Sequence, residues 1–256
     1  MRSDLWPDGC LGAVSLSFDD GMRSHLDVVA PLMTEAGLAG TFYVVPPRPI
    51  FQEHLDEWRA AARDGHEIGN HSLTHTCSRG FGDRLEARCL ERMTLEELED
   101  DVLAAERMLQ AAVGAGPRSF GYPCYQSDVG EGASRQSYVP VIARHFVAAR
   151  AKGERPNNPL TCDLHHLWSF PVERASGAEL VGLAERAAAS GTWSILTFHG
   201  VHEGHLSVAR TDFEELVAHL LRARDRIWTA PVADVAGRVA AWRERHGVLT
   251  GEQRRA

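Results

Sequence analysis

The chain has 256 residues, of which 44% are hydrophobic and 24% are charged, so it can build the core of one α/β barrel. Its formal net charge of −8 and its pI of about 5.9 argue against nucleic acid and anionic membrane partners, which need a concentrated positive patch. No apolar run is long enough for a membrane span, and the N-terminus shows no apolar stretch of secretory length.

Predicted strands and helices alternate along most of the chain. Short apolar segments predict strands at 13–18, 40–45, 119–122, 167–170, 193–198 and 227–230, and residues 126–137 are predicted to be a loop. Amphipathic stretches predict helices at 26–35, 55–63, 95–113, 139–151, 178–190, 213–224 and 232–245. Residues Thr94 to Glu97 form a capping box at the start of the third helix. Strand followed by helix, repeated about seven times, favours parallel strands with outer helices in a barrel or near-barrel.

We therefore expect a single domain over residues 1–256, with its core at about 13–245. Residues 76–93 are predicted to be an insertion, and residues 247–256 a frayed tail. Polar side chains that follow predicted strands should gather at one face of such a fold, where strands end and loops begin.

Two adjacent carboxylates, Asp19 and Asp20, end the first predicted strand. Taken alone, they are at least as well explained by a surface turn in which Asp20 caps the next helix. Two like charges this close are costly unless a cation or a proton lies between them. With a metal ion present, one carboxylate can bind the ion while the other accepts a proton from water.

Two histidines, His71 and His75, follow about fifty residues later. Their spacing of four predicts that both lie on one face of a helix, as in other zinc sites. A lone histidine pair is more often exposed surface, but Asp20 with these imidazoles makes a three-ligand set that leaves room for water. Ser72 and Thr74 are candidates to orient the ligands by hydrogen bonds. The combination predicts a metal-dependent hydrolase.

His199 follows a predicted strand and precedes Gly200, which suits a side chain presented at a strand end. A protonated histidine opposite the metal could deliver a proton to a leaving amine, whereas a buried structural histidine is the alternative. His202 and His205 are more readily explained as rim residues. The adjacent His165 and His166 would point to opposite faces of an extended segment, so they receive no role.

The cysteines are scattered and form no C-x-x-C pair (Cys10, Cys77, Cys89, Cys124 and Cys162). An odd, scattered set without an export signal is typical of reduced thiols in a cytoplasmic protein. We therefore expect a cytoplasmic location. We also expect Cys77 and Cys124 to be small buried or loop thiols, not ligands or nucleophiles.

From about Val14 to Val235 the chain resembles the polysaccharide deacetylases of carbohydrate esterase family 4, the NodB homology fold. Residues 17–21, Ser-Phe-Asp-Asp-Gly, resemble the family's first motif, and residues 71–75, His-Ser-Leu-Thr-His, its second. Residues 120–124, Phe-Gly-Tyr-Pro-Cys, stand where the third motif is expected, and residues 197–200, Thr-Phe-His-Gly, where the last is.

The resemblance implies an α/β fold, a distorted (β/α)7 barrel, with site residues in defined roles. Asp20, His71 and His75 would hold zinc or another divalent ion. Asp19 would be the general base and His199 the general acid. Cys124 would contribute a backbone N–H to an oxyanion and substrate pocket that includes Tyr122 and Pro123.

The chain also departs from the family pattern at two places. The third motif has an arginine that braces the base, but Gly121 stands at that position, so the bracing is absent or comes from elsewhere. The aspartate and tryptophan motif that tunes the acid histidine has no clean counterpart, although Asp163, Glu173 or Arg174 could stand nearby.

We predict a metal-dependent enzyme that hydrolyses a non-peptide C–N amide bond. It would remove an acyl group, most simply acetyl, from an amino sugar, an oligosaccharide or a related small amide. The cofactor would be one divalent ion, zinc first, with cobalt, nickel or manganese as alternatives. Two other hypotheses stay open: a cyclic amide or ureide hydrolase of the same fold, and a non-catalytic carbohydrate-binding relative.

Overall fold

The computed structural model describes residues 4–81 and 89–248. Residues 249–256 of the predicted tail at 247–256, and residues 82–88 of the predicted insertion at 76–93, therefore lie outside the described residues. The described chain contains the strands β1 Gly12–Asp19, β2 Thr41–Val44, β3 Glu67–Asn70, β4 Ser119–Gly121, β5 Asp128–Val129, β6 Gln136–Ser137, β7 Ala148–Arg150, β8 Phe170–Pro171, β9 Trp193–Phe198 and β10 Ile227–Thr229. It contains the α-helices α1 Ala30–Glu35, α2 Pro49–Gln52, α3 Leu55–Arg63, α4 Leu95–Val113, α5 Val139–Ala143, α6 Gly177–Ser190, α7 Arg210–Arg222 and α8 Val232–Arg245.

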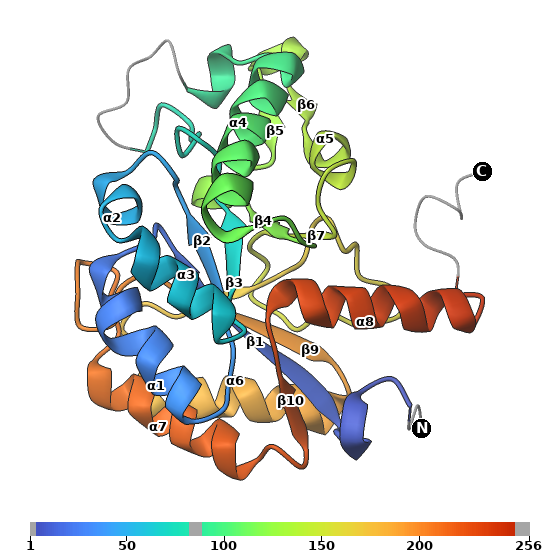
Figure 1. The fold of residues 1–256 in the computed structure, drawn as a ribbon. Coiled ribbons are helices and arrows are strands. Elements are labelled where there is room, and N and C mark those ends of the chain that lie inside the picture. Colours follow the sequence, from blue (N-terminus) through green and yellow to red (C-terminus); the bar gives the residue numbers. More distant parts are fainter. Residues whose placement is uncertain (1–3, 82–88, 249–256) are drawn as a thin grey trace.

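The main sheet is parallel and curls into a near-barrel with the helices outside it (Figure 1). Its strands follow the order β7-β4-β3-β2-β1-β9-β8, and β10 also pairs with β1. The segment before β8 returns to the other edge, because Leu167 forms a parallel bridge with Arg150 of β7. This arrangement confirms the predicted distorted barrel of alternating strands and helices.

Burial explains why the central strands are apolar along their whole length. All residues of β1 and β9 are buried, because a parallel strand covered on both faces has no solvent side. Phe18 of β1 stacks on Phe42 and Phe198 of the neighbouring strands, with ring centroids 5.2 and 5.1 Å apart. The ends of β1 and β9 are thereby fixed side by side.

Helix α4 begins where the sequence predicts, because both hydrogen bonds of the capping box form. The Thr94 side chain accepts from the Glu97 N–H, and the Glu97 side chain accepts from the Thr94 N–H. These bonds satisfy N–H groups that a helix start leaves without intrahelical partners.

The predicted helix at 139–151 is wrong in its second half. Helix α5 ends at Ala143, and residues 148–150 form strand β7, which pairs with β4 in parallel register from Ser119↔Ala148 to Gly121↔Arg150. Pairing with a strand almost thirty residues away outweighs the local helical pattern. The predicted loop at 126–137 likewise contains a short antiparallel pair, β5 and β6.

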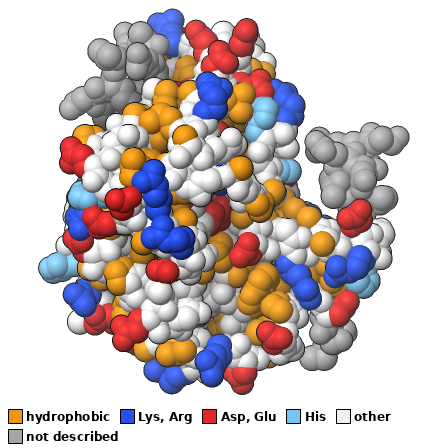
Figure 2. All heavy atoms as spheres, in the orientation of Figure 1, with side chains coloured by type: hydrophobic (Ala, Val, Ile, Leu, Met, Phe, Trp, Pro, Cys, Tyr) orange, Lys and Arg blue, Asp and Glu red, His pale blue; other side chains and the backbone are white. Residues whose placement is uncertain are grey.

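Among the described residues, no helix combines the length and the apolar character needed to span a bilayer. On the face seen in Figure 2, Lys and Arg side chains are interspersed with Asp and Glu side chains.

Candidate metal centre

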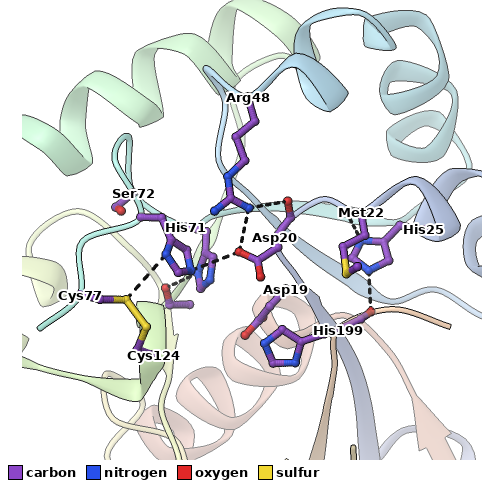
Figure 3. A network of polar contacts seen from close by, with 12 residues as sticks. Asp19, Asp20, Met22, His25, Arg48, His71, Ser72, Cys77, Cys124 and His199 are labelled. Atoms are coloured by element: carbon purple, nitrogen blue, oxygen red, sulfur yellow. Dashed lines mark hydrogen bonds and ion pairs between the residues drawn. A yellow bond between two sulfur atoms is a disulfide. The ribbon is translucent and has the colours of Figure 1, made fainter. Parts of the chain in front are cut away.

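The predicted site residues come together at the carboxyl edge of the sheet. Asp19 ends β1, His71 follows β3, and His199 follows β9. Since β1 and β9 run in parallel register to Phe18↔Phe198, the next residues, Asp19 and His199, lie beside each other (Figure 3). These three strand ends, far apart in the sequence, thus lie around one small volume.

Asp20, His71 and His75 each offer a ligand atom, and these atoms lie within 4.8 Å of one another. His75 Nε2 is 3.1 Å from Asp20 Oδ1. His71 Nδ1 donates to the Gly121 carbonyl over 2.8 Å, so a neutral His71 keeps its lone pair on Nε2. One carboxylate and two imidazoles therefore converge with the donor atoms that divalent transition metals accept.

The electrostatic environment keeps Asp20 and His71 in the protonation states that a metal ion would require. Burial opposes the charge on Asp20, but the hydrogen bond from His75 and the Arg48 guanidinium hold the pKa of Asp20 well below its usual range. Arg48 Nη1 lies 3.0 Å from Asp20 Oδ1. Burial lowers the pKa of His71 to about 3, so this imidazole is neutral at physiological pH.

The helical interpretation of the His71–His75 spacing is wrong. The segment is an irregular loop after β3, and Ser72 and His75 have positive φ angles of 62° and 53°. Asp101 of α4 holds the loop by accepting hydrogen bonds from Leu73 N (2.8 Å) and Thr74 Oγ1 (2.7 Å). Side-chain hydrogen bonds to the backbone compete with helix formation and leave the two imidazoles on an ordered loop.

Asp19 is fixed by an ion pair that sequence reasoning missed. The Arg150 guanidinium donates from Nη2 to Asp19 Oδ1 over 2.5 Å, and the Arg150 side chain is fully buried. The guanidinium lies 5.0 Å from the centre of the Tyr43 ring and 5.2 Å from that of Tyr125. Burial alone would lower the pKa of Arg150, but the Asp19 carboxylate raises it, so the guanidinium stays charged.

Gly121 leaves the room that this guanidinium occupies. A Cβ at Gly121 would lie 2.8 Å from Arg150 Nη2 and 2.7 Å from the Tyr43 ring. Within the described structure, Nε and Nη1 of Arg150 are buried and make no hydrogen bond. The cation is thus held by its single carboxylate bond and by two aromatic faces.

His199 has its backbone fixed and part of its ring unpartnered. Its carbonyl accepts from His25 Nε2 over 2.8 Å, and His25 Nδ1 accepts from Met22 N–H over 3.1 Å. Burial lowers the pKa of His25 to about 4, so His25 is neutral with both ring nitrogens engaged. The Nδ1 atom of His199 is buried and finds no hydrogen-bond partner in the described part of the chain.

The predicted pocket residues form a tight turn after β4. Tyr122 is fully buried, and its hydroxyl donates to the His165 carbonyl over 2.8 Å. Pro123–Tyr125 makes a short 3-10 turn in which Cys124 and Tyr125 have positive φ angles of 52° and 58°. The turn brings Cys124 beside the loop that carries His71 and His75, because Cys124 is bonded to Cys77 of that loop.

The expectation of reduced thiols at Cys77 and Cys124 is wrong. The two residues, 47 positions apart, form a disulfide with a Cα–Cα distance of 6.0 Å (Figure 3). Cys10, Cys89 and Cys162 form no disulfide within the described residues. No short cysteine motif in the sequence indicates this disulfide, because the two cysteines meet only through the folding of two separate loops.

Comparison with known proteins gives relatives of the same architecture. A probable polysaccharide deacetylase from Pseudomonas aeruginosa PAO1 superposes with a TM-score of 0.65 at 14% identity, covering 94% of each chain. A family 4 acetyl xylan esterase from Clostridium thermocellum, in complex with a cobalt ion, superposes with a TM-score of 0.53 at 18% identity, covering 93% of each chain. At these identities the likeness establishes the fold.

The chain is also 23% identical over 258 residues to a gellan lyase from a Bacillus species. The match covers 90% of this chain but only 9% of the gellan lyase. The family model for polysaccharide deacetylases matches residues 9–136, which include Asp19, Asp20, His71 and His75. With half of its length matched by that model, the chain belongs to the polysaccharide deacetylase family.

Proposed function

We propose that this protein is a metal-dependent deacetylase that removes an N-acetyl group from an amino sugar or amino-sugar oligosaccharide. One observation carries the proposal: the donor atoms of Asp20, His71 and His75 converge within 4.8 Å beside a second carboxylate, Asp19, which a buried arginine orients. Membership in the polysaccharide deacetylase family supports acetyl hydrolysis.

The donor set fits a divalent ion, zinc first, with cobalt, nickel or manganese as alternatives. Asp20 would bind through a carboxylate oxygen and His71 through Nε2, since Nδ1 of His71 is taken by Gly121. His75 would bind through Nε2, the nitrogen that faces Asp20. The chemistry supplied there when an ion is bound is polarisation of the acyl carbonyl and activation of water near neutral pH.

Asp19 would act as the general base. Its Oδ1 atom is held by Arg150, which leaves Oδ2 to take the proton from the attacking water. The side chain is almost fully buried, so the ion pair and the oriented carboxylate act where water screens them little. Arg150 would thus position the base without touching the substrate.

His199 would act as the general acid toward the leaving nitrogen. Its Nδ1 atom is buried and makes no hydrogen bond within the described structure, so the proton for the leaving nitrogen would come from the other ring nitrogen, Nε2. The Cys124 N–H would stabilise the developing oxyanion, and Tyr122 and Pro123 would support that turn.

The test is acetate release from N-acetylated amino sugars and their oligomers. We expect activity to disappear on chelation, to return with added Zn²⁺ or Co²⁺, and to be lost in Asp20→Ala. Asp56→Ala, at an exposed carboxylate whose side chain is 96% accessible, is the matched control and should retain activity. Activity that survives chelation, or a fully active Asp20→Ala variant, would contradict the proposal.

Two further outcomes would support a different function for the protein. Turnover of cyclic imides or ureides without acetate release would identify a ring-opening hydrolase. Sugar binding by calorimetry, with no hydrolysis under any of these metals, would identify a non-catalytic relative.

A further inference from the structure

The disulfide between Cys77 and Cys124 borders the metal centre through a single imidazole. His75 Nε2 lies 3.1 Å from Asp20 Oδ1 on one side. On the other side, His75 Nδ1 lies 3.7 Å from Cys77 Sγ. The same ring therefore faces the ligand set of the proposed hydrolytic centre and a pair of sulfur atoms.

The two sulfurs and His75 also meet the geometric requirement for a metal site of their own. His75, Cys77 and Cys124 each offer a potential ligand atom, and these atoms lie within 4.8 Å of one another. While the sulfurs are bonded to each other, neither is a thiolate. After reduction each sulfur can become a thiolate, the ligand that zinc and other thiophilic ions prefer.

We propose that reduction of this disulfide creates a second metal site, formed by Cys77, Cys124 and His75 Nδ1, for a thiophilic divalent ion such as Zn²⁺ or Cd²⁺. A dithiol reductant supplies the two electrons and two protons, and itself becomes a disulfide as the S–S bond breaks. The divalent ion then replaces both thiol protons, which pass to solvent. The inference goes beyond the proposed function, because it concerns the reduced protein and a different ligand set.

The two sites compete for His75. A neutral imidazole has one lone pair, so His75 can coordinate through Nε2 or through Nδ1 but not both. Binding through Nε2 completes the set with Asp20 and His71, and leaves the Nδ1 proton directed at the sulfurs. Binding through Nδ1 moves that proton to Nε2, where Asp20 accepts it. The oxidation state of the cysteines would therefore select which metal site is complete.

A reductant can reach the pair from the side of Cys124. Cys77 is fully buried, whereas Cys124 is partly accessible. Thiol–disulfide exchange begins with attack on one sulfur, so access to Cys124 is sufficient. The released Cys77 thiol stays beside His75, since the Cys77 carbonyl accepts from the Leu90 N–H over 3.1 Å.

The first test uses Cd²⁺ as the probe and ultraviolet absorption of cadmium–thiolate bonds as the readout. The whole protein is reduced with a phosphine, freed of reductant without oxygen, and titrated beside the oxidised protein. We expect cadmium–thiolate absorption that saturates at one Cd²⁺ per chain, in the reduced protein only, because the two sites share His75. The oxidised protein is its own control, because it retains the thiols of Cys10, Cys89 and Cys162. Absence of new thiolate absorption on reduction would overturn the proposal.

Three variants separate this site from the hydrolytic centre. Asp20→Ala should keep the cadmium–thiolate absorption, because Asp20 belongs only to the hydrolytic set. His75→Ala should weaken Cd²⁺ binding about tenfold or more, since loss of a ligand costs at least as much as loss of its hydrogen-bond partner. Cys77→Ser with Cys124→Ser should abolish the difference between reduced and oxidised protein; a persisting difference would overturn the assignment.

A second readout needs no variant. Iodoacetamide labelling of the reduced wild-type protein, followed by mass spectrometry, measures the reactivity of each cysteine. Cd²⁺ should slow labelling of Cys77 and Cys124 but not of Cys162, whose thiol lies 3.1 Å from Arg243 Nη2 in another part of the fold. Equal labelling of Cys77 and Cys124 with and without Cd²⁺ would refute the site, whatever the deacetylase assay shows.

Discussion

Replacing Arg150 with methionine tests how the proposed general base, Asp19, is held in place. The fully buried guanidinium donates to Asp19 Oδ1 over 2.5 Å, and methionine keeps much of the side-chain volume without the charge. Removing one partner of a buried ion pair typically costs about 3–5 kcal/mol, because the other charge is left uncompensated. If most of that cost falls on the transition state, kcat/KM should fall about 100-fold or more, at about 1.4 kcal/mol for each factor of ten.

The assay is kcat/KM for acetate release as a function of pH, at matched metal content. Without the guanidinium, an ionised Asp19 is an unpaired buried charge, so the variant should favour the protonated acid. The pH of half-maximal activity on the acidic side should therefore rise in Arg150→Met. Arg150→Lys restores a positive charge without the planar fork and should recover part of the activity.

Arg118 provides the matched control. It is also a buried arginine, 2.5 Å from Glu106 Oε1, and it donates to the Ile68 and Gly114 carbonyls without contacting Asp19 or a proposed metal ligand. Arg118→Met should lower the free energy of unfolding while the folded fraction keeps wild-type kcat/KM and pH profile. An Arg150→Met enzyme with unchanged kcat/KM and pH profile would refute the reasoning, as would equal losses in both variants.

Three smaller predictions follow from other contacts. Burial lowers the pKa of His25 from 6.5 to about 4, so unfolding between these pH values takes up a proton. The free energy of unfolding should therefore fall by up to about 3 kcal/mol as the pH drops from 6.5 to 4. Denaturant midpoints at several pH values should show a smaller drop in His25→Gln; an equal drop would exclude His25 as the source. Gly121→Ala should displace the Arg150 guanidinium, since the alanine Cβ would lie 2.8 Å from Nη2. The variant should have a lower kcat/KM at an unchanged metal content. Unchanged kinetics would show that the displaced guanidinium still holds Asp19. Thr94→Ala removes the cap of α4 and should cost about 1 kcal/mol in chemical unfolding with activity intact; no measurable loss would mean that solvent replaces the cap.

The convergence of the proposed metal ligands was predictable because it follows from strand order. Asp20 follows β1 and His71 follows β3, and parallel strands deliver their carboxyl ends to one edge of a sheet. The local conformation at His75 was not predictable from spacing. A separation of four fits a helix, but hydrogen bonds from the loop to Asp101, on a later helix, determine the backbone instead.

Arg150 was missed for a related reason. A strand of three residues, Ala148–Arg150, carries too little local signal to be separated from the helix before it. The segment is a strand because it pairs with β4, and that pairing depends on the arrangement of the whole sheet. The one available signal was Gly121, whose missing side chain required another residue to fill the space.

The disulfide between Cys77 and Cys124 was also not predictable from local sequence. Cys77 lies beyond the second histidine and Cys124 lies in the turn after β4, so their contact depends on how two loops fold over one edge. The absence of a short cysteine motif therefore says nothing about such a pair. The oxidised pair also removes the basis for expecting reduced thiols at these two positions.

Gly121 and Arg150 together explain how the site contains an arginine although the third motif, at residues 120–124, has none. They are register partners on adjacent strands, and the guanidinium of one occupies the room that a side chain on the other would need. The Asp19 carboxylate responds to the position of the cation and not to the strand that carries it, because Coulomb attraction depends on distance. A glycine at the motif position is therefore not evidence that the base lacks its partner, and the loss expected in Arg150→Met measures that partner directly.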